Sequence, residues 1–321
     1  GKLYETNWEI RLDTAAFPMG KMCSDDNNNI YVMLSNGYLY SVSPVGKLNW
    51  KYKICDLTPF TLFGNLLKAE DGIVVGSTDG LLQKVSFAGA NVWSISVGKE
   101  ISESFPADEK GNLYVSYTCN DFSQSDTIMK ISPTGQILSK WATEGLRVLG
   151  GIILSEDRLF VCGSQLDAQH EKRSFVASYS TDGRELWRSS IDVMPKFVST
   201  DSRQNVYCVG VSTTTANPLS GVFSFDRDGK ENWKLYLEMT AHSPLYISKK
   251  KLALVASKAG VAGLYTIKRD GTLGNTVTLT SGEPLLLRPQ VDVDGSFVFG
   301  GAERLFMAKV DDTFLNKLLP W

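Results

Sequence analysis

Short apolar stretches alternate with polar turns along the whole chain, and no stretch has the period of an amphipathic helix. Seven triplets are rich in β-branched and aromatic residues, which is typical of buried strands. They are IYV (30–32), IVV (73–75), LYV (113–115), LFV (159–161), VYC (206–208), LAL (252–254) and FVF (297–299). The pattern therefore predicts seven copies of one buried strand.

Each triplet is followed by a stretch in which apolar and polar residues alternate, as in a strand with one buried face. These stretches are 38–42, 81–85, 127–131, 175–179, 222–225, 264–267 and 305–310. A glycine turn follows six of them, and three turns contain Asp-Gly, a strong hairpin signal because glycine adopts positive φ at little cost. We expect a fourth strand after each turn. Less regular first strands are predicted at 105–109, 196–200 and 244–248.

The turn glycines reveal an internal repeat. They are Gly46, Gly89, Gly135, Gly183, Gly229 and Gly271, with spacings of 43, 46, 48, 46 and 42 residues. A period of about 45 residues with four short strands per unit is typical of a β-propeller, in which radial repetition leaves only short sheet edges. We predict a single all-β domain over 1–321, a seven-bladed β-propeller of four-stranded antiparallel blades.

The two ends of the chain suggest how the ring closes. The segment 7–12 resembles a fourth strand, whereas the last repeat ends after its third strand at 305–310. We expect the N-terminal strand to supply the outer strand of the last blade. In the alternative, 313–319 supplies it.

Tryptophans occupy one repeat position, four residues after the turn glycine, at Trp50, Trp93, Trp187 and Trp233. A tryptophan on an outer strand can cover the seam between two blades and bury about 150–250 Å². We prefer this interpretation to ligand stacking, because the column lies far from the ring axis. Trp141 is two residues late and the sixth copy has Asn275, so these two seams are expected to be weak.

Composition narrows the classes of partner. The chain is 43% hydrophobic and 21% charged, which suits a packed core, and its net charge of −2 argues against a nucleic-acid partner. No apolar run reaches the roughly 18 residues needed to span a bilayer. The five cysteines form no CxxC motif. Cys119, Cys162 and Cys208 end equivalent strands, where we expect buried free thiols.

The repeated phrase resembles the PQQ-like β-propeller repeat of quinoprotein alcohol dehydrogenases, best in 30–50 (IYVMLSNGYLYSVSPVGKLNW) and 73–93 (IVVGSTDGLLQKVSFAGANVW). Enzymes of that family hold a quinone and a calcium ion in eight blades, often against a vicinal-cysteine ring. This chain has no adjacent cysteines, so the resemblance implies the fold without the quinone cofactor, and we expect no cofactor and no metal. Non-enzymatic members are cell-envelope scaffolds that bind proteins. The resemblance therefore implies an extracytoplasmic binding role.

Polar recognition is expected where the loops between the second and third strands lengthen. These loops are tight at 35–37 and 78–80 but long at 118–126, 163–173 and 210–220, in three consecutive blades. Three adjacent long loops would build a wall at the channel mouth. The candidate ligand-binding residues on them are Asp121, Gln124, Asp126, Gln165, Asp167, His170, Arg173 and Asn217. Further candidates follow the fourth strands, at Asp56, Glu103, Arg147, Glu238, His242 and Glu283.

No catalytic signature accompanies these residues: GxSxG, HExxH and P-loop motifs are absent, and the chain has two histidines. The acidic segments 24–29, 107–111 and 291–296 are interpreted as turns between first and second strands. We therefore expect a non-enzymatic binding scaffold that recognises a protein or a carbohydrate through the loop-rich face. The alternative is an enzyme that uses carboxylates at the channel mouth on a sugar or small metabolite.

Overall fold

The structure is a computed structural model. It describes residues 18–56, 66–77, 79–97, 104–117, 125–212, 220–247, 251–259, 261–281, 290–291, 296–300 and 305–309, together with positions 10, 12, 16 and 101. All regular structure in these ranges is β-strand. The strands form antiparallel sheets, numbered here in chain order.

Each of the first three sheets is built from consecutive strands. The first sheet is β1 (Pro18–Ser24), β2 (Ile30–Leu34), β3 (Tyr38–Val42) and β4 (Leu48–Lys53). The second is β5 (Leu67–Lys68), β6 (Gly72–Gly76), β7 (Leu81–Ser86) and β8 (Asn91–Ser96). The third is β9 (Leu113–Tyr117), β10 (Thr127–Ile131) and β11 (Ile137–Ala142).

The same meander continues through the rest of the chain. The fourth sheet is β12 (Arg147–Ser155), β13 (Arg158–Leu166), β14 (Lys172–Ser180) and β15 (Glu185–Ile191). The fifth is β16 (Met194–Thr200), β17 (Val206–Val211), β18 (Ser220–Phe225) and β19 (Glu231–Leu237). The sixth is β20 (Thr240–Ala241), β21 (Tyr246–Ile247), β22 (Lys251–Lys258), β23 (Val261–Lys268) and β24 (Leu273–Ser281). The seventh is β25 (Gln290–Val291), β26 (Ser296–Gly300) and β27 (Leu305–Lys309).

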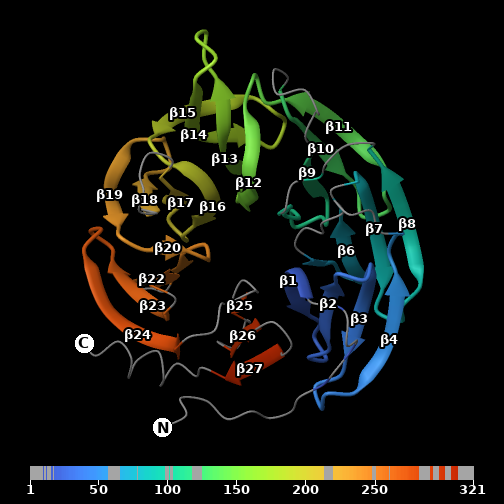
Figure 1. The fold of residues 1–321 in the computed structure, drawn as a ribbon. Helices are drawn as coiled ribbons and strands as arrows, with labels where there is room; N and C mark the ends of the chain where they lie inside the picture. The colour runs from blue at the N-terminus through green and yellow to red at the C-terminus, as the bar shows by residue number, and fades with distance from the viewer. Residues whose placement is uncertain are drawn as a thin grey trace.

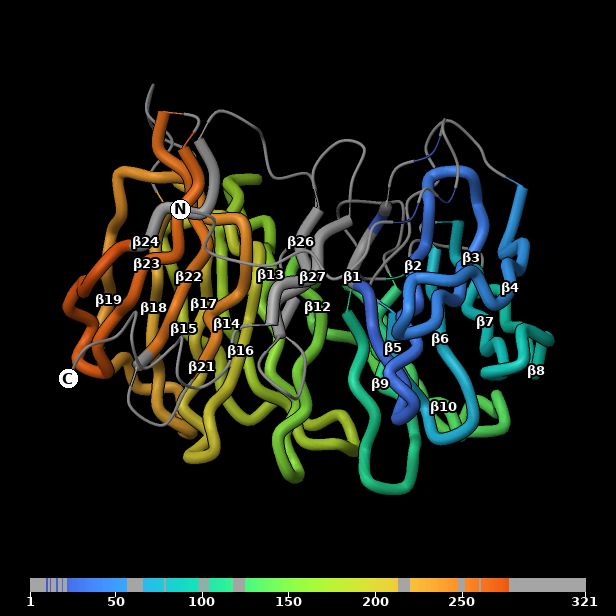
Figure 2. The backbone as a smooth tube through the Cα atoms, turned by 90° about the horizontal axis from the view of Figure 1, so that it is seen from below, coloured from blue at the N-terminus to red at the C-terminus, as the bar shows by residue number. Residues whose placement is uncertain are grey.

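The sheets stand in a ring, with the first strands toward the centre and strands such as β4, β8 and β19 on the perimeter (Figure 1). The sheet of β25–β27 lies between the sixth sheet and the first. Seen from below, the antiparallel strands of successive sheets all stand roughly upright in the view (Figure 2). This is propeller geometry. The number of blades stays a prediction, because 313–319 and most of 7–12 lie outside the described residues.

The predicted second and third strands are confirmed in all seven copies, from IYV in β2 to FVF in β26. Among the first strands, 196–200 lies within β16, while 244–248 is strand only at Tyr246–Ile247. The segment 105–109 contributes one bridge, between Ala107 and Leu113. First strands are the hardest to predict, since they contact the next sheet as well as their own and follow no simple alternation.

The core consists of separate apolar clusters between successive sheets. Between the fourth and fifth sheets, Phe160 and Cys162 meet Cys208 and Phe223. The Cys162 and Cys208 thiols are buried and free, as predicted, and Cys119 lies outside the described residues. Five of the six clusters in the described residues combine side chains of two successive sheets, and the sixth joins the first sheet to Leu12 and Ala16.

A tryptophan and a glycine form a lock across each of five seams. The pairs are Trp50 with Gly89, Trp93 with Gly135, Trp141 with Gly183, Trp187 with Gly229, and Trp233 with Gly271. In four pairs the indole N–H also donates to a carbonyl of the same turn at 2.8–2.9 Å, and the acceptors are Phe87, Pro133, Arg227 and Arg269. The prediction that these tryptophans cover the seams is confirmed.

The seam between the third and fourth sheets departs from this pattern. Trp141 still lies over Gly183, but its buried Nε1 has no hydrogen-bond partner within the described residues. Arg188 of β15 compensates by donating to the Thr143 carbonyl at 3.0 Å and to Gln165 Oε1 at 2.7 Å. The weakness of this seam stays a prediction, and Arg188 gives the seam polar contacts of its own. The seam expected to be weak at Asn275 adjoins side chains outside the described residues.

Three turns between first and second strands repeat the pattern Asp-x-x-x-Asn-x-Tyr, starting at Asp25, Asp108 and Asp201. In the third, Asp201 accepts hydrogen bonds from two backbone N–H groups, the Asn205 amide and the Tyr207 hydroxyl, at 2.9–3.1 Å. Burial alone would raise the pKa of Asp201, but these bonds outweigh it and hold the pKa below its usual range. The acidic segments 24–29 and 107–111 are therefore turns, as predicted, and 291–296 lies mostly outside the described residues.

Candidate functional site

The segment 163–173 is a projecting hairpin rather than a long loop. Its residues extend β13 and β14, which pair as far as Leu166 and Lys172, and only a short turn from Asp167 to Glu171 connects them. The outer strand β15 stops pairing at Ser174, so the tip stands clear of the sheet. The prediction of a loop was wrong here. The paired residues 164–166 and 172–174 are polar except for Leu166, so they show no alternation of apolar and polar residues.

Four predicted residues come together on this hairpin. Asp167 caps the turn and pairs with Arg173 at 2.9 Å, and this bond leads the causes that lower the pKa of Asp167. His170 is exposed, with a φ of 61°. Gln165 accepts the hydrogen bond from Arg188. The Arg173 side chain is 64% exposed, against 21% for Asp167.

The other predicted residues do not join them. Asp121, Gln124 and Asn217 lie outside the described residues. Asp126 is only 1% exposed, and its Oδ2 accepts a hydrogen bond from the Val148 N–H at 2.7 Å. The carboxylate therefore ties the end of the third sheet to the start of the fourth and presents no surface to a ligand.

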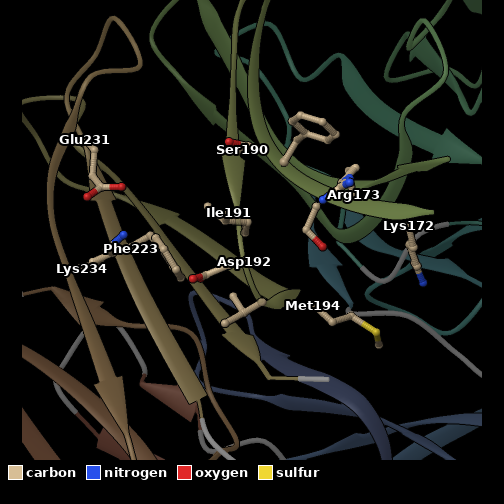
Figure 3. Close-up of a pocket in the computed structure, with 12 residues that line it drawn as sticks. Lys172, Arg173, Ser190, Ile191, Asp192, Met194, Phe223, Glu231 and Lys234 are labelled. Atoms are coloured by element: carbon tan, nitrogen blue, oxygen red, sulfur yellow. The ribbon is translucent and has the colours of Figure 1, made fainter. Parts of the chain in front are cut away.

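A groove of about 610 Å³ opens beside the hairpin, between the fourth and fifth sheets. Its base is apolar and consists of Phe175, Ile191, Val193 and Phe223, the last three of which are buried. Its exposed walls carry Lys172, Arg173, Asp192, Met194, Glu231 and Lys234. Figure 3 shows Lys172 and Arg173 on one side and Glu231 and Lys234 on the other. The site thus joins an apolar base to walls of both charges.

Asp192 and Met194 give the groove one polar and one apolar wall residue. Asp192 accepts a hydrogen bond from the Tyr236 hydroxyl; partial burial, and then this bond, raise the pKa of Tyr236 to about 12. Met194 is apolar and yet 37% exposed. Methionine has a flexible side chain and is common at adaptable binding surfaces. Such a surface can accept an extended polypeptide segment, with apolar side chains below and charged ones at the edges.

Sequence reasoning found Arg173 but missed the other lining residues. Ser190–Met194 connects β15 to β16 and directly follows the repeat that contains Trp187. The one signal of this groove in the sequence was the apolar Met194 two positions after the charged Asp192. The groove itself depends on how two sheets pack, which no local pattern encodes.

The residues predicted after the fourth strands are scattered. Asp56 pairs with Lys53, Glu238 pairs with Lys258 at 3.2 Å, and Arg147 lies in β12. His242 Nε2 lies 2.7 Å from Ser257 Oγ, and burial together with Lys196 lowers the pKa of His242. Glu103 and Glu283 lie outside the described residues. The four of these residues that the structure describes form no common site.

Within the described ranges, no group of three or more His, Cys, Asp or Glu side chains is placed to hold a metal ion. The same part of the chain contains no helix with the length and apolar character needed to cross a membrane.

Comparisons with known proteins agree with this architecture. The chain matches the model of a family described as "Outer membrane protein assembly factor BamB" over residues 78–307. No curated protein sequence matches. Among solved structures, BamB from Moraxella catarrhalis is 14% identical with a TM-score of 0.63, and the match covers 95% of this chain and 97% of that one.

Two further structures have similar propellers. A chain of the mitotic checkpoint complex is 10% identical, with a TM-score of 0.72 and coverage of 96% and 95%. The Dos1 propeller is 12% identical, with a TM-score of 0.65 and coverage of 92% and 78%. At these identities the similarity concerns the fold. The family match spans most of the chain and agrees with the repeat, the sheets and the seam tryptophans. The chain therefore belongs to the BamB-like family of proteins built from PQQ-like propeller repeats.

Proposed function

We propose that this protein is a binding scaffold that holds a segment of a partner protein in the groove between its fourth and fifth sheets. The groove carries the proposal, because it combines a buried apolar base with exposed charges of both signs beside a projecting hairpin. Interfaces of this kind derive affinity from the apolar centre and specificity from the polar rim.

The family description supports a role in assembly, since its named member is an outer membrane protein assembly factor. A second similar propeller belongs to a protein complex, the mitotic checkpoint complex. A cell-envelope location is part of the proposal, and fractionation of the producing cells tests it.

The test is a photo-crosslinking amino acid placed at Met194, with a matched probe at Val45. Val45 is also apolar and is 79% exposed, but it lies in a turn of the first sheet. We expect a specific crosslinked product from position 194 and none from 45. The crosslinked protein is then purified, and its affinity is measured by titration against the unmodified chain.

The substitution Met194→Asp replaces the apolar side chain of the groove wall by a charge and should weaken the binding of the purified partner about tenfold or more. Val45→Asp should leave the affinity unchanged. Equal crosslinking from both positions, or full affinity in Met194→Asp, would remove the groove as the binding site. Turnover of a glycan or small metabolite that stops on loss of Asp192 and Glu231 would instead favour the enzyme.

We also propose seven blades, with 7–12 as the outer strand of the last one. Deletion of residues 1–12 should then lower the unfolding midpoint, whereas deletion of 313–321 should not. The opposite result would assign that strand to 313–319.

A further inference from the structure

A second pocket, of about 710 Å³, opens across the seam between the fifth and sixth sheets. It shares no lining residue with the groove. The Asp201 turn forms one side, Trp233 and Asn232 of β19 form another, and Arg269 reaches in from the turn between β23 and β24. Its lining is polar and contains guanidinium, amide, hydroxyl and indole groups.

The first seam of the ring offers a direct comparison, because its residues repeat those of the pocket. Asp25, Asn29, Tyr31 and Trp50 of the first sheet correspond to Asp201, Asn205, Tyr207 and Trp233 of the fifth. The position of Arg269, however, is held by Phe87 in the first seam. The Phe87 ring packs against Tyr31 with centroids 5.9 Å apart. The same position is therefore apolar in the first seam, at Phe87, and charged in the seam between the fifth and sixth sheets, at Arg269.

Arg269 is held in a fixed place. Its Nη1 donates to Asp201 Oδ2 and to the Tyr207 hydroxyl, both at 2.8 Å, while 32% of its side chain remains exposed. A second cation lies nearby at Arg203, which is exposed and has no ion-pair partner within the described residues. The pocket thus presents two guanidinium groups against one buried carboxylate.

The amide of Asn232 is also less engaged than its counterpart. In the first seam, Asn49 donates to Asn29 at 3.1 Å and to Ser41 at 3.2 Å. In the pocket, the same two contacts of Asn232 lengthen to 3.5 and 3.4 Å. Weak internal contacts leave this amide with hydrogen-bonding capacity for a ligand.

We propose that this pocket binds an anionic saccharide. Sugar hydroxyls suit the Asn232 amide and the Ser202 hydroxyl, a sugar carboxylate or sulfate suits Arg203 and Arg269, and the apolar face of a pyranose suits the Trp233 indole. The volume lies within the range of ordinary small-ligand sites. A small inorganic anion would leave the amide and indole unused, and the chain's net charge of −2 disfavours nucleic acid.

The test is calorimetric titration of the purified chain with four probes in 0.15 M salt. The probes are a galacturonate hexamer, a heparin hexasaccharide, the neutral maltohexaose and a ten-residue oligothymidylate. We expect one charged saccharide to bind at least tenfold more tightly than maltohexaose. The first two probes distinguish a carboxylate from a sulfate source.

The decisive variant is Arg269→Phe, which installs the side chain that the first seam already uses. Asp201 should remain satisfied, since Asp25 keeps the same set of hydrogen bonds with no ion pair within the described residues. We expect a loss of at least tenfold in saccharide affinity, and a severalfold loss in Asn232→Ala. The matched control is Arg227→Ala, the equivalent turn position of the fifth sheet, which should retain affinity.

Circular dichroism shows whether each variant is folded. If Arg269→Phe does not fold, Asn232→Ala still tests the pocket. The proposal is overturned if neither charged saccharide binds more tightly than maltohexaose, or if oligothymidylate binds better. It is also overturned if the folded pocket variants keep full affinity, or if Arg227→Ala loses as much as they do.

Discussion

The seam lock between Trp187 and Gly229 predicts a large cost for adding one methyl group. Gly229 has a φ of 87°, and a Cβ built there would lie 2.5 Å from Trp187 Cδ2. The indole cannot simply move aside, because its N–H donates to the Arg227 carbonyl at 2.9 Å. Gly229→Ala therefore imposes both backbone strain and a steric clash.

The two penalties can be separated. A non-glycine residue in the left-handed region costs about 1–2 kcal/mol, and overpacking a filled site costs about 1–3 kcal/mol. Gly229→Ala should then lower the free energy of unfolding by about 2–5 kcal/mol. Gly37 is the control for the backbone penalty, since it has a φ of 81° but lies in the turn between β2 and β3, away from the seam tryptophans paired with glycines above. Gly37→Ala should therefore show the backbone penalty without the indole clash.

Urea unfolding followed by far-ultraviolet circular dichroism measures these changes. Coincident fluorescence transitions establish whether unfolding is two-state. In a double-mutant cycle with Trp187→Ala, the clash disappears, so Gly229→Ala should cost about 1–3 kcal/mol less than in the parent. The reasoning is refuted if Gly229→Ala costs no more than Gly37→Ala, or if its cost is the same with and without the Trp187 indole.

Three further predictions concern polar contacts. Trp187→Phe should destabilise the protein by about 1 kcal/mol more than Trp141→Phe in urea unfolding, because only the Trp187 N–H has a described acceptor; equal costs would contradict the role of that bond. Arg188→Leu should cost about 2 kcal/mol, since it removes the charged donor to Glu185 and the Thr143 carbonyl and leaves the Tyr179 hydroxyl to serve both, and a cost below Trp141→Phe would contradict its role in the seam. Because the folded-state pKa of Asp201 is lowered, its stabilisation is present above the unfolded-state value of 3.8 and is lost as pH falls through the folded-state pKa. Thermal unfolding should therefore show that the advantage of the parent over Asp201→Asn shrinks on acidification below about pH 4, and a constant difference would contradict this linkage.

Much of the fold follows from local patterns. The triplet IYV became β2 and the alternating YLYSV became β3, because apolar residues with a period of two can only be buried on one face of a sheet. The tryptophan column likewise predicted the cover over the seams, whereas the contact of each tryptophan with the turn glycine of the next repeat is known only from the structure. The first strands were predicted only in part: 196–200 lies within β16, whereas 105–109 contributes a single bridge, because such a segment depends on the sheet that it joins.

The candidate site was less accessible to sequence reasoning. Arg173 was found because it lies near a predicted irregularity, although that irregularity is a pair of extended strands. Asp126 was selected for its carboxylate, yet its hydrogen bond to the Val148 N–H buries it between two sheets. A carboxylate that binds a ligand and one that is buried between sheets have the same local sequence pattern. Only the residues packed around the carboxylate distinguish the two.

The sequence by itself determined the repeat, the second and third strands and the place of the seam tryptophans, because these depend on residues within one repeat. The tertiary structure alone decided where the seams are hollow. Replacement of Phe87 by Arg269 at one repeat position leaves the strands unchanged but turns a filled seam into a polar pocket. The groove beside Met194 is likewise lined by residues of two sheets, and the volume between packed sheets depends on side chains from several distant segments at once.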